Sequence, residues 1–232
     1  MLSNIARTSF GSLLVAGIVL VLGNRATAAN TERPGPLPSP AIDEPLAATK
    51  GQQTAVFAGG CFWGVEAVFR HVKGVKSAVS GYAGGKVVAP SYEQVSSGST
   101  GHAESVRVVY DPSQVTYGQL LRVFFSVAHD PTQLNRQGPD VGTQYRSAIF
   151  YSTDSQKRIA TAYVDQLTKA KSFSRPIVTE VSALERFNVA EDYHQDYAAL
   201  HPYEPYIMFN DAPKVANLKR EFAALYVEPR KR

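Results

Sequence analysis

The sequence has one cysteine, Cys61, and one tryptophan, Trp63, among its 232 residues. A single thiol excludes an intramolecular disulfide and a multi-cysteine metal site, and the five histidines lack metal-ligand spacing, so we expect no metal. Clustered basic residues are absent apart from Arg230–Arg232, which argues against nucleic-acid binding. With 44% hydrophobic and 19% charged residues, the composition is that of a globular domain, and it excludes a wholly disordered, collagen-like or multi-pass membrane protein.

Long apolar runs are confined to the N-terminal region, where Phe10–Gly23 forms a 14-residue stretch that no acidic residue precedes. Small residues follow at Ala26 and Ala28, the two positions that a signal peptidase reads. We therefore expect residues 1–28 to be a signal peptide, cleaved after Ala28 or Ala29, and the protein to be exported to the periplasm. The stretch is shorter than the roughly 20 residues of a membrane helix. An uncleaved membrane anchor is one alternative, and secretion is the other.

Residues 29–50 are expected to form an exposed, proline-rich linker. Five prolines crowd into residues 34–45, a composition that favours extended polyproline II structure and cannot build a core. The folded domain is therefore placed at residues 51–232. We expect this domain to be a monomer and its only membrane contact to be made through the signal before cleavage.

Hydrophobic periodicity predicts alternating strands and helices along the folded part. The expected elements are strands at 54–58, 75–82, 104–110, 145–151 and 177–184, and helices that open at Cys61 or span 116–128, 153–171, 190–200 and 214–226. The order strand–helix–strand–strand–helix–strand is typical of an α+β fold, a two-layer α/β plait (split βαβ, ferredoxin-like) with helices on one face of a mostly antiparallel sheet. Long loops and a C-terminal extension complete the expected architecture.

Cys61 lies where a predicted strand turns into a predicted helix. The preceding Gly59 and Gly60 allow a tight turn. A thiol at a helix N-terminus faces free backbone N–H groups and the positive end of the helix dipole, so we expect the thiolate to be favoured. A buried, inert thiol is the alternative. However, Phe62 and Trp63 indicate an aromatic pocket beside a nucleophile, and an unpaired cysteine in an exported protein suggests a function.

Glu104 heads one face of the strand at 104–110, and the face is otherwise apolar. Burial there raises the pKa of a carboxyl group, as a general acid near neutral pH requires. The alternative is a solvent-exposed carboxylate at a frayed strand end. Tyr145 begins the strand at 145–151 in the same way, an arrangement typical of a packed ring with its phenol at the rim.

Two functional classes fit part of the sequence, one enzymatic and one not. Cys61, His194 and Asn210 follow the chain order of the catalytic residues in papain-like proteases, although the local Cys-Gly-Ser-Cys-Trp signature is absent. A cysteine hydrolase is therefore the competing enzyme class. The other class is an exported binding module that recognises its partners through Phe62 and Trp63 without turnover.

Seven short motifs follow one another along the folded part. They are Gly60–Gly64, Gly81–Gly85, Ser97–Glu104, His129–Pro131, Gln137–Ser147, Ala190–Gln195 and Pro205–Ile207. Together they resemble, in this order, the A-type peptide-methionine sulfoxide reductases. The likeness extends from about residue 54 to residue 226, and the first motif, Gly-Cys-Phe-Trp-Gly, is highly specific by itself.

The resemblance implies stereospecific reduction of methionine S-sulfoxide, free or in oxidised proteins, with repair of exported proteins as the role. Cys61 would attack the sulfoxide sulfur, Glu104 would protonate the oxygen, and Cys61 would remain as a sulfenic acid. No cofactor is implied, because the thiol supplies both electrons. The implied substrate-binding residues are Phe62 and Trp63 around the S-methyl group, Tyr92 and Tyr145 as donors to the oxygen, and Asp140 as a positioning carboxylate.

The chain departs from many members of that family because it has no second cysteine to form a resolving disulfide. The resemblance therefore implies that the sulfenic acid at Cys61 is attacked by an external thiol. A thioredoxin-like protein, a glutaredoxin-like protein or a small thiol would supply it. The expected partners are this reductant and the methionine sulfoxide substrates.

Overall fold

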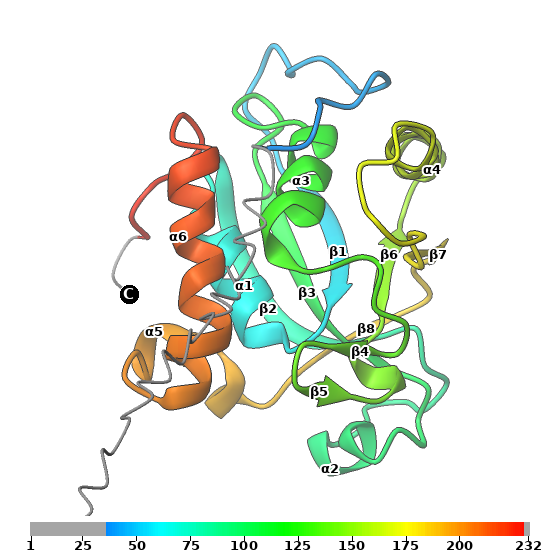
Figure 1. The fold of residues 1–232 in the computed structure, drawn as a ribbon, viewed down its shortest axis with the longest axis vertical. Helices are drawn as coiled ribbons and strands as arrows, with labels where there is room; N and C mark the ends of the chain where they lie inside the picture. Colours follow the sequence, from blue (N-terminus) through cyan, green and yellow to red (C-terminus); the bar gives the residue numbers. More distant parts are fainter. Residues whose placement is uncertain (1–35, 230–232) are drawn as a thin grey trace, which may run out of the picture. The chain divides into compact units, whose positions relative to one another are not determined.

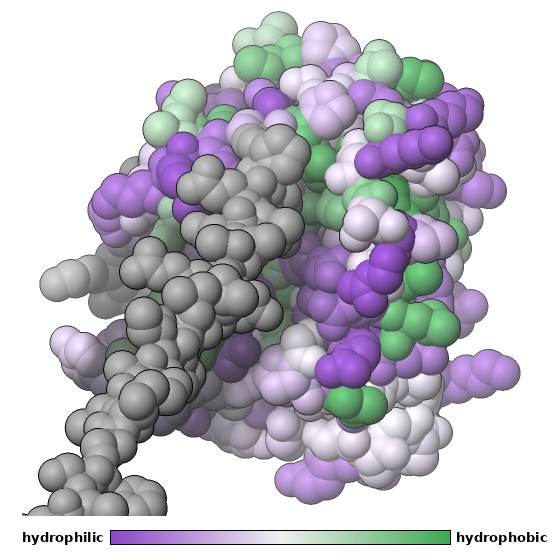
Figure 2. Space-filling view, in the orientation of Figure 1, coloured by the Kyte–Doolittle hydropathy of each residue, from purple (hydrophilic) through white to green (hydrophobic). Residues whose placement is uncertain are grey.

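The structure is a computed structural model that describes residues 36–229. The predicted signal peptide lies outside the described residues. Within residues 36–229, no helix combines the length and the apolar character that crossing a membrane requires. On the face shown in Figure 2, hydrophilic and hydrophobic residues are interspersed outside the grey region.

Six strands form one sheet in the order β7-β6-β1-β3-β2-β8 (Figure 1). The strands are β1 (Gln53–Gly59), β2 (Val75–Ala83), β3 (Ala103–Tyr110), β6 (Ser147–Tyr151), β7 (Glu180–Ala183) and β8 (Phe187–Val189). All neighbours are antiparallel except β6 and β7, which are parallel and joined through a helix. The central order β6-β1-β3-β2 is that of a split βαβ plait, so the predicted fold class is confirmed.

Four helices cover one face of this sheet, as predicted. They are α1 (Phe62–Arg70), α3 (Tyr117–Val123), α4 (Asp154–Lys169) and α6 (Ala212–Glu221), with α3 continued by the π-helix η1 (Phe124–Ala128). Figure 1 shows α6 beside α1. The main core lies between helices and sheet, and in it the ring of Phe57 stacks on Phe69 and Phe124 at centroid distances of 5.1 and 5.0 Å. The opposite face buries a smaller cluster, rich in alanine.

The loops contain short elements that periodicity does not predict. One is α2 (Tyr92–Ser96), which begins with a capping box made by Ser91 and Gln94. Three more lie in the polar loop 129–146. They are the paired strands β4 (Arg136–Gln137) and β5 (Asp140–Val141) and the 3₁₀ turn η2 (Thr143–Tyr145). Tyr145 therefore precedes β6, and the prediction that it begins this strand is wrong.

The C-terminal region differs from the expected pair of helices. The helix expected at 190–200 is divided into a 3₁₀ turn, η3 (Asp192–His194), and a short helix, α5 (Tyr197–Leu200). Asp196, which lies between them, adopts a left-handed φ of 59° that a continuous helix cannot contain. A π-helix, η4 (Ile207–Asp211), then leads directly into α6.

The prediction of an exposed linker at 29–50 needs correction for residues 36–50, because this segment packs on α3, η1 and α4. Leu37 is buried, and the carbonyl oxygen of Pro38 accepts a hydrogen bond of 2.8 Å from Tyr163. Asp43 accepts hydrogen bonds from the Thr116 hydroxyl at 2.5 Å and from the Gly118 N–H at 2.9 Å. These long-range contacts join the proline-rich segment to the first turn of α3, so the folded unit begins before residue 51.

Candidate active site

Cys61 is the N-cap residue of α1, at the point where the chain leaves β1. Gly60 makes the turn with a φ of +88°, and a Cβ at that position would lie 2.5 Å from the Cβ of Gln137. Both the backbone and the available space therefore require glycine there. Cys61 itself is buried, with 7% of its surface exposed.

Glu104 lies on the core-facing side of β3, directly below the start of α1. Its residue surface is 2% exposed, and its Oε2 accepts a hydrogen bond of 3.0 Å from the backbone N–H of Phe62. Burial, with smaller contributions from Asp140 and Asp211, raises the pKa of Glu104 to about 8. The carboxyl group is therefore protonated at neutral pH, as predicted from the strand pattern, and the alternative of a solvated strand end is wrong.

The ionisation of Cys61 differs from the expectation. Burial raises the pKa of the Cys61 thiol well above its usual value. The charge that Glu104 acquires when it ionises at higher pH adds to this effect, and so does the charge of Asp211. The nearby backbone N–H of Trp63 and the ammonium of Lys214 act in the opposite direction but do not outweigh burial. The prediction that the helix N-terminus favours the thiolate is therefore wrong for the site at rest, which holds a neutral thiol.

Aromatic rings form one wall of the site. Phe62 is buried, and its ring centroid lies 6.4 Å from that of Trp63. Trp63 stacks on Tyr197 at a centroid distance of 3.8 Å, and the edge contact of its ring with Tyr206 measures 5.9 Å between centroids. Its Nε1–H donates a hydrogen bond of 3.3 Å to Nδ1 of His194. The indole is thus held by stacking on Tyr197, by the edge contact with Tyr206 and by the hydrogen bond of its Nε1–H.

Two phenols face the reacting pair of Cys61 and Glu104. Burial raises the pKa of both Tyr92 and Tyr145, and the charge that Glu104 acquires above its own pKa adds to the shift in each case. Both hydroxyl groups are therefore protonated hydrogen-bond donors over the physiological pH range. The backbone N–H of Tyr92 donates to Oε1 of Glu191 at 2.9 Å, which ties α2 to the segment before η3.

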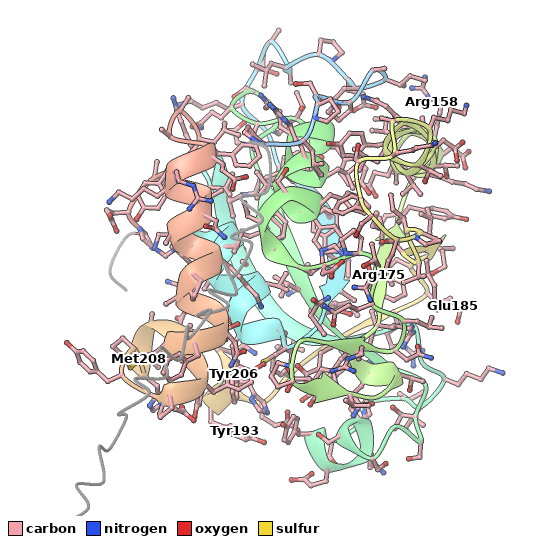
Figure 3. All side chains as sticks on the ribbon, viewed as in Figure 1. Arg158, Arg175, Glu185, Tyr193, Tyr206 and Met208 are labelled. Carbon is pink, nitrogen blue, oxygen red and sulfur yellow. The ribbon has the colours of Figure 1, made fainter. Side chains whose placement is uncertain are left out.

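Asp140 of β5 is held by a residue that the motif reasoning assigned no role. The hydroxyl of Tyr206 donates a hydrogen bond of 2.5 Å to Oδ2 of Asp140. Figure 3 places Tyr206 and Tyr193 at the same end of the molecule, below α6 and away from Arg158 on α4. Tyr206 thereby connects the aromatic wall, through Trp63, to the carboxylate of the loop.

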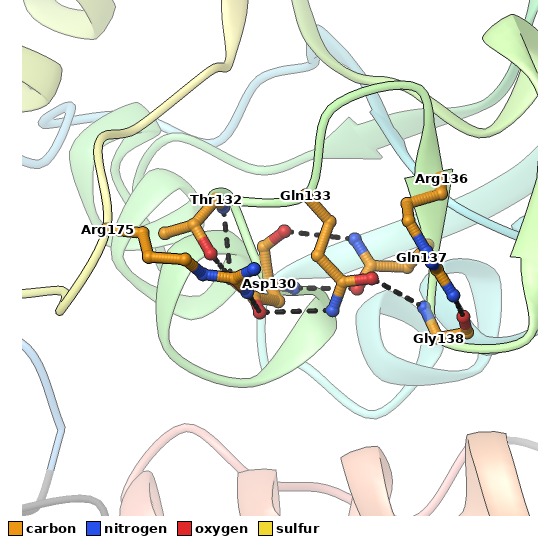
Figure 4. A network of polar contacts seen from close by, with 7 residues as sticks. All are labelled: Asp130, Thr132, Gln133, Arg136, Gln137, Gly138 and Arg175. Atoms are coloured by element: carbon orange, nitrogen blue, oxygen red, sulfur yellow. Dashed lines mark hydrogen bonds and ion pairs between the residues drawn. The ribbon is translucent and has the colours of Figure 1, made fainter.

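A network of polar contacts fixes this loop (Figure 4). The Asp130 carboxylate accepts hydrogen bonds from the Thr132 and Gln133 side chains and pairs with Arg175 at 3.3 Å. Gln137 bonds to both the N–H and the carbonyl oxygen of Asp130, at 3.1 Å each. Because Gln137 also packs on Gly60, the network positions the loop against the turn that carries Cys61.

The residues of the competing hydrolase prediction do not assemble. His194 is buried and accepts its hydrogen bond from Trp63, and its ring contacts Phe62 rather than the thiol. Asn210 donates to the backbone carbonyl of Tyr206 at 3.0 Å. Within residues 36–229, Cys61, His194 and Asn210 therefore form no hydrogen-bonded triad, and the papain-like prediction is wrong.

The sequence reasoning also missed an ion pair next to the site, formed by Asp211 and Lys214. Asp211 is the N-cap residue of α6 and is 1% exposed, and its Oδ1 lies 3.0 Å from Nζ of Lys214. An aspartate followed by a proline within the first helical turn is a typical start signal, so the boundary at 212 could have been predicted. In the described part of the chain, no group of three His, Cys, Asp or Glu residues could hold a metal ion.

Comparisons with known proteins agree with this arrangement. A family model described as peptide methionine sulfoxide reductase matches residues 53–225. A peptide methionine sulfoxide reductase MsrA 2 of Mesorhizobium japonicum is 63% identical over 181 residues, which are 78% of this chain and 93% of that protein. A protein of the same name from Synechocystis is 51% identical over 189 residues, 81% of this chain and 88% of that protein.

Solved structures show the same fold. The structure of methionine sulfoxide reductase A of Corynebacterium diphtheriae is 37% identical, with a TM-score of 0.58, and the match covers 75% of this chain and 90% of that one. The reduced form of Mxr1 from Saccharomyces cerevisiae is 32% identical, with a TM-score of 0.59, and the match covers 71% and 92% of the two chains.

Proposed function

Because the chain belongs to the peptide methionine sulfoxide reductase family and reduces methionine S-sulfoxide with thiol electrons, we propose that Cys61 is its nucleophile and Glu104 its general acid. One observation carries this assignment. A buried thiol and a buried carboxyl group in its acid form meet at the first turn of α1, where the Phe62 N–H orients the carboxyl group. No other thiol exists in the chain to take the role.

The reaction begins with both groups neutral. Glu104 donates its proton to the sulfoxide oxygen, which makes the sulfur electrophilic. As the Cys61 sulfur attacks, its thiol proton passes to the carboxylate that Glu104 has become, which restores the acid. The oxygen atom passes to the Cys61 sulfur, methionine leaves, and Cys61 becomes a sulfenic acid that has supplied two electrons. One proton enters the substrate as one leaves the thiol. The buried site therefore never has to hold a net additional charge.

The surrounding side chains hold the substrate in place. Tyr92 and Tyr145, both protonated, donate hydrogen bonds to the sulfoxide oxygen as negative charge develops there. Phe62 and Trp63 enclose the S-methyl group between apolar rings. Asp140, held by Tyr206, positions the loop that closes this side of the site.

An external thiol restores Cys61. It attacks the sulfenic sulfur to form a mixed disulfide and release water, and a second thiol reduces this disulfide and frees Cys61. The absence of a second cysteine supports this route, because no internal disulfide can form. A thioredoxin-like protein, a glutaredoxin-like protein or a small thiol is the proposed donor.

The decisive assay measures turnover of the two diastereomers of a methionine sulfoxide peptide with dithiothreitol as reductant. The S form is consumed, the R form is not, and Cys61→Ser abolishes activity without unfolding the protein. Equal rates for the two forms, or activity in Cys61→Ser, would refute the assignment. Mass spectrometry of Cys61 after one equivalent of sulfoxide, without reductant, detects the sulfenic acid. An unmodified thiol would point to a binding module, and an acyl adduct formed from an ester or peptide substrate to a hydrolase.

We propose that the enzyme is exported to the periplasm as a monomer and repairs oxidised proteins there. The apolar stretch Phe10–Gly23 and the small residues before Ala29 support removal of a signal peptide. N-terminal sequencing of the protein from fractionated cells tests this. A start at residue 29 or 30 in the periplasmic fraction supports the proposal. An intact N-terminus in the membrane fraction, or the protein in the medium, supports one of the two alternatives.

A further inference from the structure

The ion pair of buried Asp211 and partly exposed Lys214, at the start of α6, packs against the first turn of α1. A Cβ built on Gly64 would overlap Oδ1 of Asp211 and would lie 2.7 Å from Nζ of Lys214. Asp211 and Lys214 thus fill the space that any side chain at residue 64 would need. Gly64 belongs to the same short motif as Cys61, so this motif is shaped by the C-terminal helix as well as by the substrate.

The ion pair lies on the same side of α1 as the thiol. Gly64 follows Cys61 by three residues, and residues three apart share one face of a helix. The side chain of an N-cap residue also turns towards the backbone N–H groups two and three positions later. This placement explains the electrostatic effects on the thiol, since Asp211 raises the pKa of Cys61 and Lys214 lowers it.

Asp211 has an unused hydrogen-bonding atom. Its Oδ2 is buried and has no hydrogen-bond partner among the described residues, although a buried carboxylate oxygen without a partner is destabilising. Burial and the charge of Asp140 raise the pKa of Asp211, while Lys214 opposes this and favours the carboxylate. A helix cap needs no such arrangement, and the Asp211 side chain makes no hydrogen bond to the N–H groups of its own helix. The group is therefore placed to act on its surroundings.

We propose that Asp211, held by Lys214, is a positioning residue that keeps Cys61 protonated between turnovers by acting through the first turn of α1. This inference rests on the proposed role of Cys61. An enzyme without a resolving cysteine carries a free thiol whenever it waits for substrate. Oxidants and electrophiles attack the thiolate and not the thiol, so suppression of the thiolate protects the nucleophile until sulfoxide binds.

Other groups also face Cys61 and stay unchanged in the experiment. They are Glu104 of β3 and the phenols Tyr92, Tyr145, Tyr197 and Tyr206. Three further groups lie one residue away from the thiol: Asp140 acts on Glu104 and Asp211, His129 lies against Gly59, and His194 contacts Phe62. Burial sets most of the ionisation of Cys61, and Glu104 contributes more than Asp211. The effect of Asp211 is therefore measured as the difference in the Cys61 alkylation midpoint between the wild type and a variant in which burial and Glu104 are unchanged.

The test is the pH dependence of Cys61 alkylation by iodoacetamide in the full chain. Cys61 is the only thiol, so the signal reports this residue alone. Asp211→Asn lowers the alkylation midpoint, because it removes a negative charge that disfavours the thiolate. Alkylation and oxidation by hydrogen peroxide at a fixed pH below the midpoint then become faster, by tenfold for each pH unit of the shift. Lys214→Arg keeps the cation and the wild-type midpoint, and the exposed Asp154→Asn serves as the matched control.

A second variant covers the case in which Asp211→Asn leaves Lys214 unpaired and fails to fold. The double variant Asp211→Asn with Lys214→Met removes both charges. Its midpoint moves in the same direction by a smaller amount, because Asp211 affects the thiol more than Lys214 does. An unchanged midpoint in the folded variant would overturn the proposal and leave the pair a packing role. Alkylation needs no turnover, so an inactive wild-type enzyme would refute the proposed function without deciding this test.

Discussion

Replacing Glu104 by glutamine should make the protein more stable and almost inactive at the same time. The variant keeps the shape of the side chain and an oxygen that can accept the hydrogen bond from Phe62 N–H, which measures 3.0 Å in the wild type. It removes the proton that we assign to the sulfoxide oxygen. General acid catalysis contributes about 10²- to 10⁴-fold to a rate, so kcat should fall by that factor.

The gain in stability follows from the pKa of the buried carboxyl group. That pKa is about 8 in the folded protein, against 4.5 for a free glutamic acid side chain. Below the pKa of the unfolded chain, 4.5, the group is protonated in both states and costs the folded protein no stability. As the pH rises from 4.5 towards 8, the unfolded chain releases the proton first, so the free energy of unfolding falls. At pH 7 the free energy of unfolding has fallen by about 3 kcal/mol, and Glu104→Gln avoids this loss because glutamine does not ionise.

Chemical denaturation at pH 4 and pH 7 measures this difference, with the exposed Glu185→Gln as the control. Glu104→Gln should match the wild type at pH 4 and exceed it at pH 7. The kcat of the wild type should decline as the pH rises through about 8, where Glu104 loses its proton. The difference in stability between Glu104→Gln and the wild type should grow from pH 4 to pH 7. If it does not grow, or if the variant retains full activity, Glu104 is not a protonated acid.

Two further variants test how the site and the N-terminal segment are held. Gly60→Ala forces a φ of +88° on alanine and a contact with Gln137, so the free energy of unfolding should fall by about 1–3 kcal/mol and kcat should fall with it, as denaturation and turnover will show. Asp43→Ala removes two hydrogen bonds at the start of α3 and should lower stability by about 1–2 kcal/mol in thermal denaturation while leaving kcat unchanged. Lost activity in Asp43→Ala would contradict this separation of roles.

Local sequence patterns predicted the parts of the fold that depend on neighbouring residues. Alternation along residues 104–110 placed Glu104 on the buried face of β3, and helical spacing after Cys61 located α1. Both are properties of a few adjacent residues and need no knowledge of the rest of the chain. The split βαβ order followed from the sequence of these elements.

Features that depend on distant residues escaped prediction. The neutral state of Cys61 results mainly from burial, to which Asp211 before α6 and, once it ionises, Glu104 on β3 add, and these effects outweigh the helix terminus. The packing of residues 36–50 depends on partners such as Thr116 and Tyr163, which lie far along the chain. Proline content alone cannot show whether a segment finds such partners, since polyproline structure leaves its backbone groups free to bond elsewhere.

The position of Trp63 makes the intrinsic fluorescence of the protein a probe of the active site. It is the only tryptophan in the chain, it stacks on Tyr197, and its Nε1–H is bonded to His194. Tryptophan emission from this protein therefore originates at the wall of the site and nowhere else. Binding of a sulfoxide and oxidation of Cys61 each change the surroundings of this ring. Separate steps of a turnover can thus be followed in real time on the unlabelled, unmodified enzyme.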